Sequence, residues 1–391
     1  MRFKKLLPLI LCAVFFSGCW DKVEIDRRSF ITSIAIDVGK DIGKQEELKS
    51  ISPDEPFPER RIKKLSITYG FPDISQLGPG KAGTASEKYI NTDAYSMEDA
   101  VAQGTLKSSR NLYYGHGKLL LLSSDVLNYP DVVREVLDYL ERQPTINKMM
   151  MVVAVEGKAE EYLKFKPEME KNVDEYINGL MANSSRAASI LPITLKEMFV
   201  NLSENGNAIV PWMTFDKTKK ELVLSGVAVI KGFALKGFLN PIETGDLEIL
   251  RGKLKNGKKL VYKEGHPVDF IIEDLDRKIK VNNKNGKLFV NIDIAIEGSI
   301  KGYYYGKGVS DTKTIEALEK DISKSLSVEL REVVKITQNE FMVDPIGIRE
   351  YVEKYNPGFW NKIKDNWEET YKNADVNVTV TTHVRRVGVA K

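Results

Sequence analysis

The first twenty residues constrain this chain most, because they are typical of an export leader and not of a folded element. Basic residues at positions 2, 4 and 5 precede an uninterrupted apolar run from Leu6 to Phe16, and Ser17-Gly18 then precede Cys19. The run is about half of the roughly 20 residues that a helix needs to span a bilayer. We therefore expect residues 1–18 to be a removable signal peptide.

The position of Cys19 indicates which kind of leader this is. Phe16-Ser17-Gly18-Cys19 looks like a lipobox, in which the cysteine thiol receives a diacylglyceryl group and becomes the new N-terminus. Two acyl chains are enough to hold a soluble domain at a membrane surface. The expected product is a lipoprotein attached to the outside of a membrane through Cys19. The alternative is a plain signal peptide that a cysteine follows by chance.

Composition narrows the chemistry of the mature chain. The only two cysteines are Cys12, inside the leader, and Cys19, so a disulfide, a thiolate metal site and a cysteine nucleophile are excluded after residue 19. His116, His266 and His383 lie far apart and match no metal or base signature. The net charge of +3 gives no indication of nucleic acid as a partner. We expect no catalytic, cofactor-binding or metal site.

Residues 19–158 have the pattern of an N-terminal α/β domain. Apolar strands are expected at 30–38, 64–69, 119–122 and 149–155, and the first two should pair. Helices are expected from Met97, capped by Ser96, and over 131–142. The order strand, helix, strand predicts a crossover unit and hence a mixed sheet.

Residues 159–215 read as a small, mainly helical linking domain. Leu191-Pro192-Ile193 interrupts the helical pattern, and Thr194 is expected to cap a further helix over 195–202. Prolines and short helices are typical of a segment between two larger domains.

Residues 216–391 are expected to form a C-terminal α+β domain, so the fold class of the whole is α+β with three domains. Two strands are expected within 222–239 and a short helix over 246–254, and Asn285-Gly286 predicts a tight hairpin between strands at 277–281 and 287–299. A long helix near 311–333 should cover this antiparallel sheet. Asp344-Pro345 and Asn356-Pro357 each predict a helix start, and valines alternate in a last strand at 376–384.

Two clusters and two absent motifs bear on function. A basic run could contact anionic lipid headgroups or be a solvated turn, and Tyr303-Tyr304-Tyr305 could stack a ligand or pack in a strand. Neither Gly-x-Ser-x-Gly nor Gly-x-Gly-x-x-Gly follows an expected strand. The basic run consists of Arg251, Lys253, Lys255, Lys258, Lys259 and Lys263.

Several short motifs together resemble the Ger(x)C spore germination lipoproteins, the C subunits of nutrient germinant receptors of the GerAC, GerBC and GerKC type. The resemblance runs along essentially the whole mature chain. Its motifs are Cys19-Trp20-Asp21, Ile34-Ala35-Ile36-Asp37, Tyr114-Gly115-His116-Gly117-Lys118, Arg142, Gly226-Val227-Ala228-Val229-Ile230, Gly237-Phe238-Leu239 and Asp344-Pro345-Ile346-Gly347-Ile348, followed by Pro357, Trp360 and Trp367.

The resemblance implies a three-domain, non-enzymatic receptor component tethered to the outer face of the spore inner membrane. Its implied partners are a partly membrane-embedded A subunit and a transporter-like B subunit. One alternative is a lipid-anchored solute-binding protein that delivers a small molecule to a transporter, which would need two similar lobes around a cleft. Another is an anchored hydrolase, which would need clustered carboxylates with Ser or His.

Overall fold

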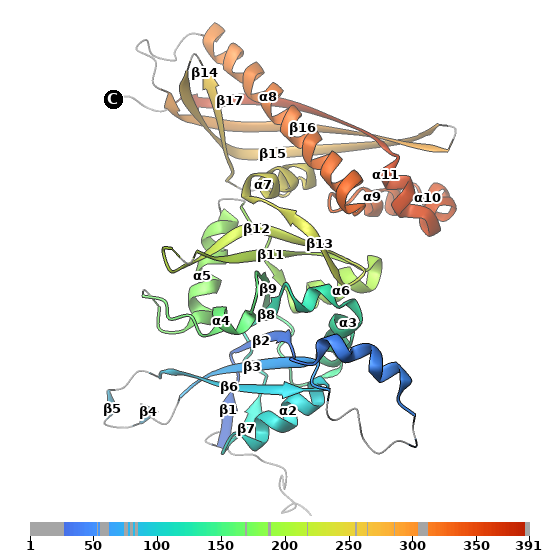
Figure 1. Ribbon diagram of the computed structural model, residues 1–391. Coiled ribbons are helices and arrows are strands. Elements are labelled where there is room, and N and C mark those ends of the chain that lie inside the picture. Colours follow the sequence, from blue (N-terminus) through green and yellow to red (C-terminus); the bar gives the residue numbers. More distant parts are fainter. Residues whose placement is uncertain are drawn as a thin grey trace, which may run out of the picture.

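The protein has an α+β fold, as expected (Figure 1). The structure is a computed structural model that describes residues 27–52, 54, 62–73, 77–78, 81–82, 85–168, 170–186, 189–216, 218–254, 256–263, 265–284, 286–303 and 312–387. Within these ranges, a helix long and apolar enough to cross a bilayer is not found.

A nine-stranded mixed sheet forms the larger part of the molecule. Its strand order is β13-β12-β11-β9-β8-β2-β3-β6, and the short β10 pairs with β9. The strands are β2 (Ser33–Val38), β3 (Leu65–Pro72), β6 (Glu87–Ala94), β8 (Leu119–Ser123), β9 (Met151–Val155), β10 (Ile193–Thr194), β11 (Asn207–Asp216), β12 (Glu221–Lys231) and β13 (Ala234–Leu239).

The centre of this sheet is parallel and its flanks are antiparallel. β2, β8, β9 and β11 are parallel neighbours, whereas β2 pairs antiparallel with β3, which confirms the expected pairing. Helix α3 (Pro130–Arg142) connects β8 to β9, which confirms the crossover unit. All five residues of β8 are buried, because helices cover both faces of a parallel sheet.

Helices on opposite faces create two separate cores. Leu120 and Leu122 pack with α2 (Met97–Leu106), α3 and α6 (Leu195–Asn205). Leu119 and Leu121 pack on the other face with α4 (Ala159–Leu163) and α5 (Val173–Arg186). The helices of 159–215 therefore lie on this sheet.

Both helix caps expected in this part are confirmed. The Ser96 hydroxyl accepts the main-chain N–H of Asp99 at 3.2 Å at the start of α2. Thr194 forms a reciprocal capping box with Glu197 at the start of α6. Each cap satisfies a backbone donor that the first helical turn leaves unpaired.

The strands after residue 216 do not all join the C-terminal sheet. The expected boundary falls between β11 and β12, which pair antiparallel along most of their length. β12 and β13 therefore extend the nine-stranded sheet, although the sequence pattern places them with the C-terminal α+β domain. The apolar pattern within 222–239 predicts the strands, but it does not identify their neighbours.

A four-stranded sheet in the order β14-β15-β16-β17 forms the other part (Figure 1). The expected hairpin is confirmed and is longer than its pattern indicated, and Gly286 in its turn has φ +81°, while Asn285 lies outside the described residues. β17 pairs parallel with β16, so the expectation of a purely antiparallel sheet was wrong. The strands are β14 (Lys258–Lys263), β15 (His266–Lys284), β16 (Lys287–Tyr303) and β17 (Asp375–Val387).

The parallel β16–β17 pair follows from the helices between these strands. Helix α8 (Thr312–Lys335) covers the sheet as expected and continues into a π-helical turn at Ile336–Phe341. Three further helices complete the crossover, and parallel neighbours require such a connection. They are α9 (Ile348–Tyr355), α10 (Pro357–Ile363) and α11 (Trp367–Lys372).

One of the two Pro-marked helix starts is confirmed. Asn356 caps α10 by accepting the N–H of Phe359, with Pro357 in the first turn. The start expected at Asp344-Pro345 was wrong, because α9 begins at Ile348 and Asp344 instead binds the loop before it.

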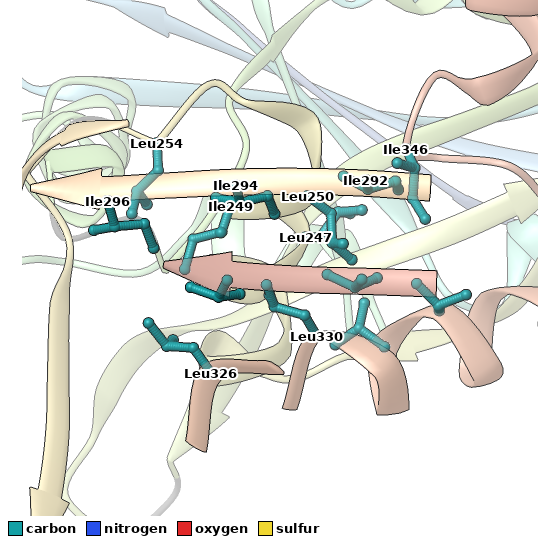
Figure 2. Packing of buried hydrophobic residues seen from close by; sticks show 14 of the residues in the cluster. Leu247, Ile249, Leu250, Leu254, Ile292, Ile294, Ile296, Leu326, Leu330 and Ile346 are labelled. Carbon is teal, nitrogen blue, oxygen red and sulfur yellow. The ribbon is translucent and has the colours of Figure 1, made fainter. Parts of the chain in front are cut away.

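Helix α7 (Pro241–Arg251) joins the two sheets. It begins five residues before the expected 246–254 helix, because Asn240 caps it and Pro241 fits its first turn. Figure 2 shows Leu247, Ile249 and Leu250 of α7 near Ile292 and Ile294 of β16. The same hydrophobic core includes Val227 and Val229 of β12, whereas Ala228 and Ile230 belong to a core on the other face.

Smaller elements complete the fold. β1 pairs parallel with β7 at the lower end of the molecule in Figure 1, opposite the four-stranded sheet. The remaining elements are β1 (Arg28–Phe30), β4 (Leu77–Gly78), β5 (Lys81–Ala82), β7 (Asn111–Tyr113) and 3-10 turns at Ile42–Ser50, Val126–Asn128 and Lys364–Asn366.

Candidate functional site

The lipidation residue Cys19 and the signal peptide lie outside the described residues, as does everything before Arg27. Lipidation of Cys19 therefore stays a prediction. The described chain begins just before β1, at the end of the molecule farthest from the four-stranded sheet (Figure 1).

The three histidines lie on different elements. His116, in the loop before β8, packs against Phe30 with ring centroids 4.9 Å apart. His266 begins β15, and His383 lies on β17 opposite Glu297 of β16. Over the described ranges, no group of three or more His, Cys, Asp or Glu side chains is arranged to hold a metal ion.

The basic run is largely neutralised within the chain. Lys258 and Lys263 form ion pairs of 2.7 Å with Asp269 and Asp321. Lys259 pairs with Glu329 of α8 and is mostly buried. These lysines attach β14 to its neighbours, which fits neither a lipid-binding patch nor a freely solvated turn. Lys255, and Tyr304 and Tyr305 of the tyrosine cluster, lie outside the described residues.

Asp37, the last residue of one shared motif, binds the start of a helix. Its carboxylate accepts the N–H groups of Ala159 at 2.7 Å and Glu160 at 2.9 Å, at the first turn of α4. Burial raises the pKa of Asp37 to about 6, although these hydrogen bonds act in the opposite direction. The role of Asp37 is structural, because both hydrogen bonds satisfy backbone donors of α4 that would otherwise be unpaired.

The glycines of two other motifs permit close packing. A Cβ on Gly226, which has φ +100°, would lie 2.0 Å from the Leu239 carbonyl oxygen. A Cβ on Gly237 would lie 2.5 Å from the ring of Phe341. Gly226 therefore permits close approach of β12 to the end of β13, and Gly237 permits close approach of β13 to the π-helical turn that contains Phe341.

A crevice opens where the two sheets meet. It consists of two hollows of about 640 and 550 Å³, which share Glu204, Asn207 and Asp344 in their lining. Residues from α6 and β11 form one side, and residues from α7, β15, α9 and α10 form the other. This crevice is the candidate functional site, since it combines volume with residues of a shared motif.

Asp344 organises one wall of the crevice. Its carboxylate accepts main-chain N–H groups from Ile346 at 3.1 Å, Gly347 at 3.2 Å and Arg349 at 2.6 Å. Burial, followed by the nearby Glu350, raises the pKa of Asp344 to about 7. The side chain therefore shapes the loop that begins α9.

A cluster of cations faces this wall. The Arg277 guanidinium donates to the carbonyl oxygens of Leu250 at 2.8 Å and Ile346 at 3.2 Å, and burial lowers its pKa. The neighbouring Arg251 charge, followed by burial, lowers the pKa of Lys253. Arg277 thus ties the end of α7 to the loop that Asp344 shapes.

The lining of the crevice limits its chemistry. Among the described residues that line it there is no Ser, Thr, Cys or His. Its two sides come from unlike sheets, one of nine mixed strands and one of four, and not from two similar lobes. The sequence pattern did not predict the crevice, although Asp344-Pro345-Ile346-Gly347 marks one of its walls.

Two tryptophans of the shared motifs, Trp360 and Trp367, lie together. Trp360 and Trp367 meet edge to face with centroids 5.6 Å apart, and Trp367 stacks on Tyr371 at 6.0 Å. They lie on two short helices and not one, because a 3-10 turn separates α10 from α11. Arg349 covers the face of Trp360 at 5.5 Å and connects this group to the crevice.

Comparisons with known proteins cover nearly the whole chain. Residues 21–215 match the family described as spore germination protein N-terminal domain, and residues 225–388 match the family described as spore germination B3/GerAC like, C-terminal. Spore germination protein YndF of Bacillus subtilis (strain 168) is 27% identical, with 100% of this chain and 99% of the relative covered. Spore germination protein KC of the same organism is 24% identical, with 97% and 95% covered.

A solved structure supports the fold independently. The crystal structure of the GerBC protein aligns with a TM-score of 0.59 at 21% identity, covering 82% of this chain and 93% of that chain. The N-terminal match contains the shared motifs between Ile34 and Arg142, and the C-terminal match contains those between Gly226 and Trp367. The chain belongs to the Ger(x)C family of spore germination proteins.

Proposed function

We propose that this protein is the lipid-anchored C subunit of a spore nutrient germinant receptor and assembles there with membrane A and B subunits. The observation that supports this most strongly is the pair of family matches over residues 21–215 and 225–388. The proposal places the protein on the outer face of the spore inner membrane and gives it no enzymatic role.

The anchor supplies the physical mechanism. A diacylglyceryl group on Cys19 would retain the chain at the membrane, because each buried CH₂ contributes about 0.8 kcal/mol and two chains are present. Residues 20–26 allow at most about 30 Å between Cys19 and Arg27. Confinement within this distance of the membrane raises the effective concentration of the protein for weak contacts with the A and B subunits.

The roles of the motif residues support a component that assembles and does not catalyse. Asp37 and Asp344 bind backbone N–H groups, and Gly226 and Gly237 permit close packing. These positions preserve the shape of the molecule and the wall of its crevice.

The test compares Cys19→Ala with Cys12→Ala in the same chain, expressed in spores from its own locus. Cys12 lies inside the leader, so its loss should leave acylation, membrane retention and germinant response unchanged. Cys19→Ala should lose the acylated N-terminus, detected by mass spectrometry, and the response to nutrients. A full response from a non-acylated Cys19→Ala protein would refute the role of the anchor.

Assembly is tested separately by purification of a C-terminally tagged chain from spore membranes. We expect two membrane proteins, an A and a B subunit, to purify with the wild-type chain in fixed ratio. If neither subunit is recovered in mild detergent after crosslinking, the proposed complex is wrong.

A further inference from the structure

A second cavity, separate from the crevice, lies between α7, β14 and α8. Its volume is about 470 Å³, which is within the roughly 300–1,000 Å³ range of small-molecule pockets. Ile249, Leu254, Ile272 and Leu326 form apolar walls and are nearly completely buried. Figure 2 shows three of these residues, Ile249, Leu254 and Leu326, beside β16 and α8.

The exposed part of the lining contains two apolar residues beside Lys258, whose side chain is 59% exposed. Ile242, in the first turn of α7, is 72% exposed, and Leu260 of β14 is 43% exposed. Aliphatic side chains at these exposures leave apolar surface in water around the opening. A ligand with a hydrocarbon body would cover this surface and the walls behind it, and burial of apolar area is favourable.

Of the two acidic side chains that line the cavity, Asp246 and Glu329, Asp246 is the more deeply buried. Asp246 of α7 lines it and is only 6% exposed, and within the described ranges its carboxylate receives no hydrogen bond. Burying a carboxylate without a donor is unfavourable, so this group is suited to a ligand that brings one. Asp246 differs in this respect from Asp37 and Asp344, whose carboxylates each accept two or more backbone N–H groups.

The charges around Asp246 favour a cation as the partner. Burial raises the pKa of Asp246 to about 7, and the carboxylates of Glu329 on α8 and Glu243 on α7 act in the same direction. The Lys259 ammonium on β14 lowers it but is hydrogen-bonded to Glu329, and Lys258 is paired with Asp269.

We propose that the cavity between α7, β14 and α8 binds a small aliphatic amine, with its hydrocarbon body on the apolar walls and its ammonium group on Asp246. The ammonium supplies the donor and the charge that this carboxylate lacks. An aliphatic carboxylate would be repelled by Asp246, because the two lysines that also line the cavity, Lys258 and Lys259, are already paired with Asp269 and Glu329. An uncharged alcohol would supply a donor without the charge. The proposal goes beyond receptor assembly and does not depend on it.

The test measures binding of isopentylamine, isopentanol and isovalerate to the full mature chain by ligand-observed NMR at about pH 8. The three probes share a branched hydrocarbon body and differ in the charge of the head group. We expect the amine to bind at least about tenfold more tightly than the alcohol and the acid to show no binding. Asp246→Asn should remove the preference for the amine, because the isosteric amide carries no charge.

The pH dependence provides a second readout on the wild-type chain. If the ionised carboxylate binds the ammonium, affinity for isopentylamine should rise about tenfold between pH 6 and pH 8, since Asp246 loses its proton over this interval. In Asp246→Asn this rise should disappear. Affinity for isopentanol should change little in either protein.

Asp274→Asn is the matched control, because Asp274 is an exposed aspartate of β15 outside the cavity lining. It should bind the amine as the wild type does, and thermal melts should show that both variants fold. The proposal is overturned if isopentylamine fails to bind at millimolar concentration, if the alcohol binds equally well, or if Asp246→Asn keeps the preference for the amine.

Discussion

The Asp37 carboxylate accepts the main-chain N–H of Ala159 at 2.7 Å across 122 residues of sequence. This bond joins the end of β2 to the first turn of α4, on the face of the large sheet that α4 and α5 cover. The carboxylate is buried, so its charge state affects the stability of this connection.

The first prediction concerns the pH dependence of stability. The pKa of Asp37 is raised from 3.8 to about 6, so between these values the folded chain holds a proton that the unfolded chain has lost. Stability must then fall as pH rises through this interval, by about 3 kcal/mol, at 1.36 kcal/mol per pKa unit. We expect Asp37→Asn to lack this fall, measured as urea unfolding at about pH 4 to 7.

Asp125→Asn serves as the control for that series, because Asp125 is exposed. It should keep the wild-type pH profile. Parallel profiles for wild type and Asp37→Asn would contradict the assignment of the raised pKa to Asp37.

The second prediction concerns a buried hydroxyl pair. The hydroxyl groups of Thr337 and Tyr371 are 2.7 Å apart, and both side chains are fully buried. Tyr371→Phe should lower the free energy of unfolding by about 1 kcal/mol, because one hydrogen bond between the π-helical turn and α11 is lost. Tyr355→Phe, at a 62% exposed tyrosine, should change it by less than about 0.5 kcal/mol.

The third prediction concerns Gly226. Alanine there would place Cβ 2.0 Å from the Leu239 carbonyl oxygen at a φ of +100°. Relieving that contact requires β12 and β13 to separate, so Gly226→Ala should destabilise the fold by at least about 3 kcal/mol. Gly358→Ala in α10, where a Cβ meets nothing within 4 Å, should be neutral or slightly stabilising. Equal melting temperatures for Gly226→Ala and Gly358→Ala would contradict the close packing of β12 against β13 at Gly226.

The fourth prediction concerns cooperativity between the two sheets. Leu250 of α7 is fully buried in a core that contains β12 residues on one side and β16 residues on the other. Leu250→Ala should lower stability by about 2 to 5 kcal/mol and should shift a single unfolding transition as a whole. Leu106→Ala, at an 81% exposed leucine, is the control. Two separate calorimetric transitions in the wild type would show that the sheets unfold independently.

Local sequence patterns predicted the elements that depend only on residues close together in the chain. The run Leu119–Leu122 predicted a strand, and Asn285-Gly286 between two strand patterns predicted the hairpin of β15 and β16. The caps at Ser96, Thr194 and Asn356 were predicted because each bond spans only three residues. These features depend on short-range geometry alone.

Features set by distant partners were not predictable in the same way. The apolar pattern of β12 does not distinguish β11 from β15 as its neighbour, whereas the structure pairs β12 with β11 and β13 and packs one of its faces with α7. Asp344 before Pro345 has the pattern of a helix cap, yet its three N–H partners place it in the loop before α9. The crevice and the Asp246 cavity depend on contacts between elements that are tens of residues apart, so no local motif marks them.

The pairing of β11 with β12 has a practical consequence for truncation. The two family matches divide the chain between residues 215 and 225, between these paired strands. A fragment cut there would leave a row of unpaired backbone donors and acceptors along β11, and a matching row along β12 in the other fragment. Exposed strand edges of this kind recruit further chains, so each half expressed alone should aggregate, and the two should be soluble only when they are produced together.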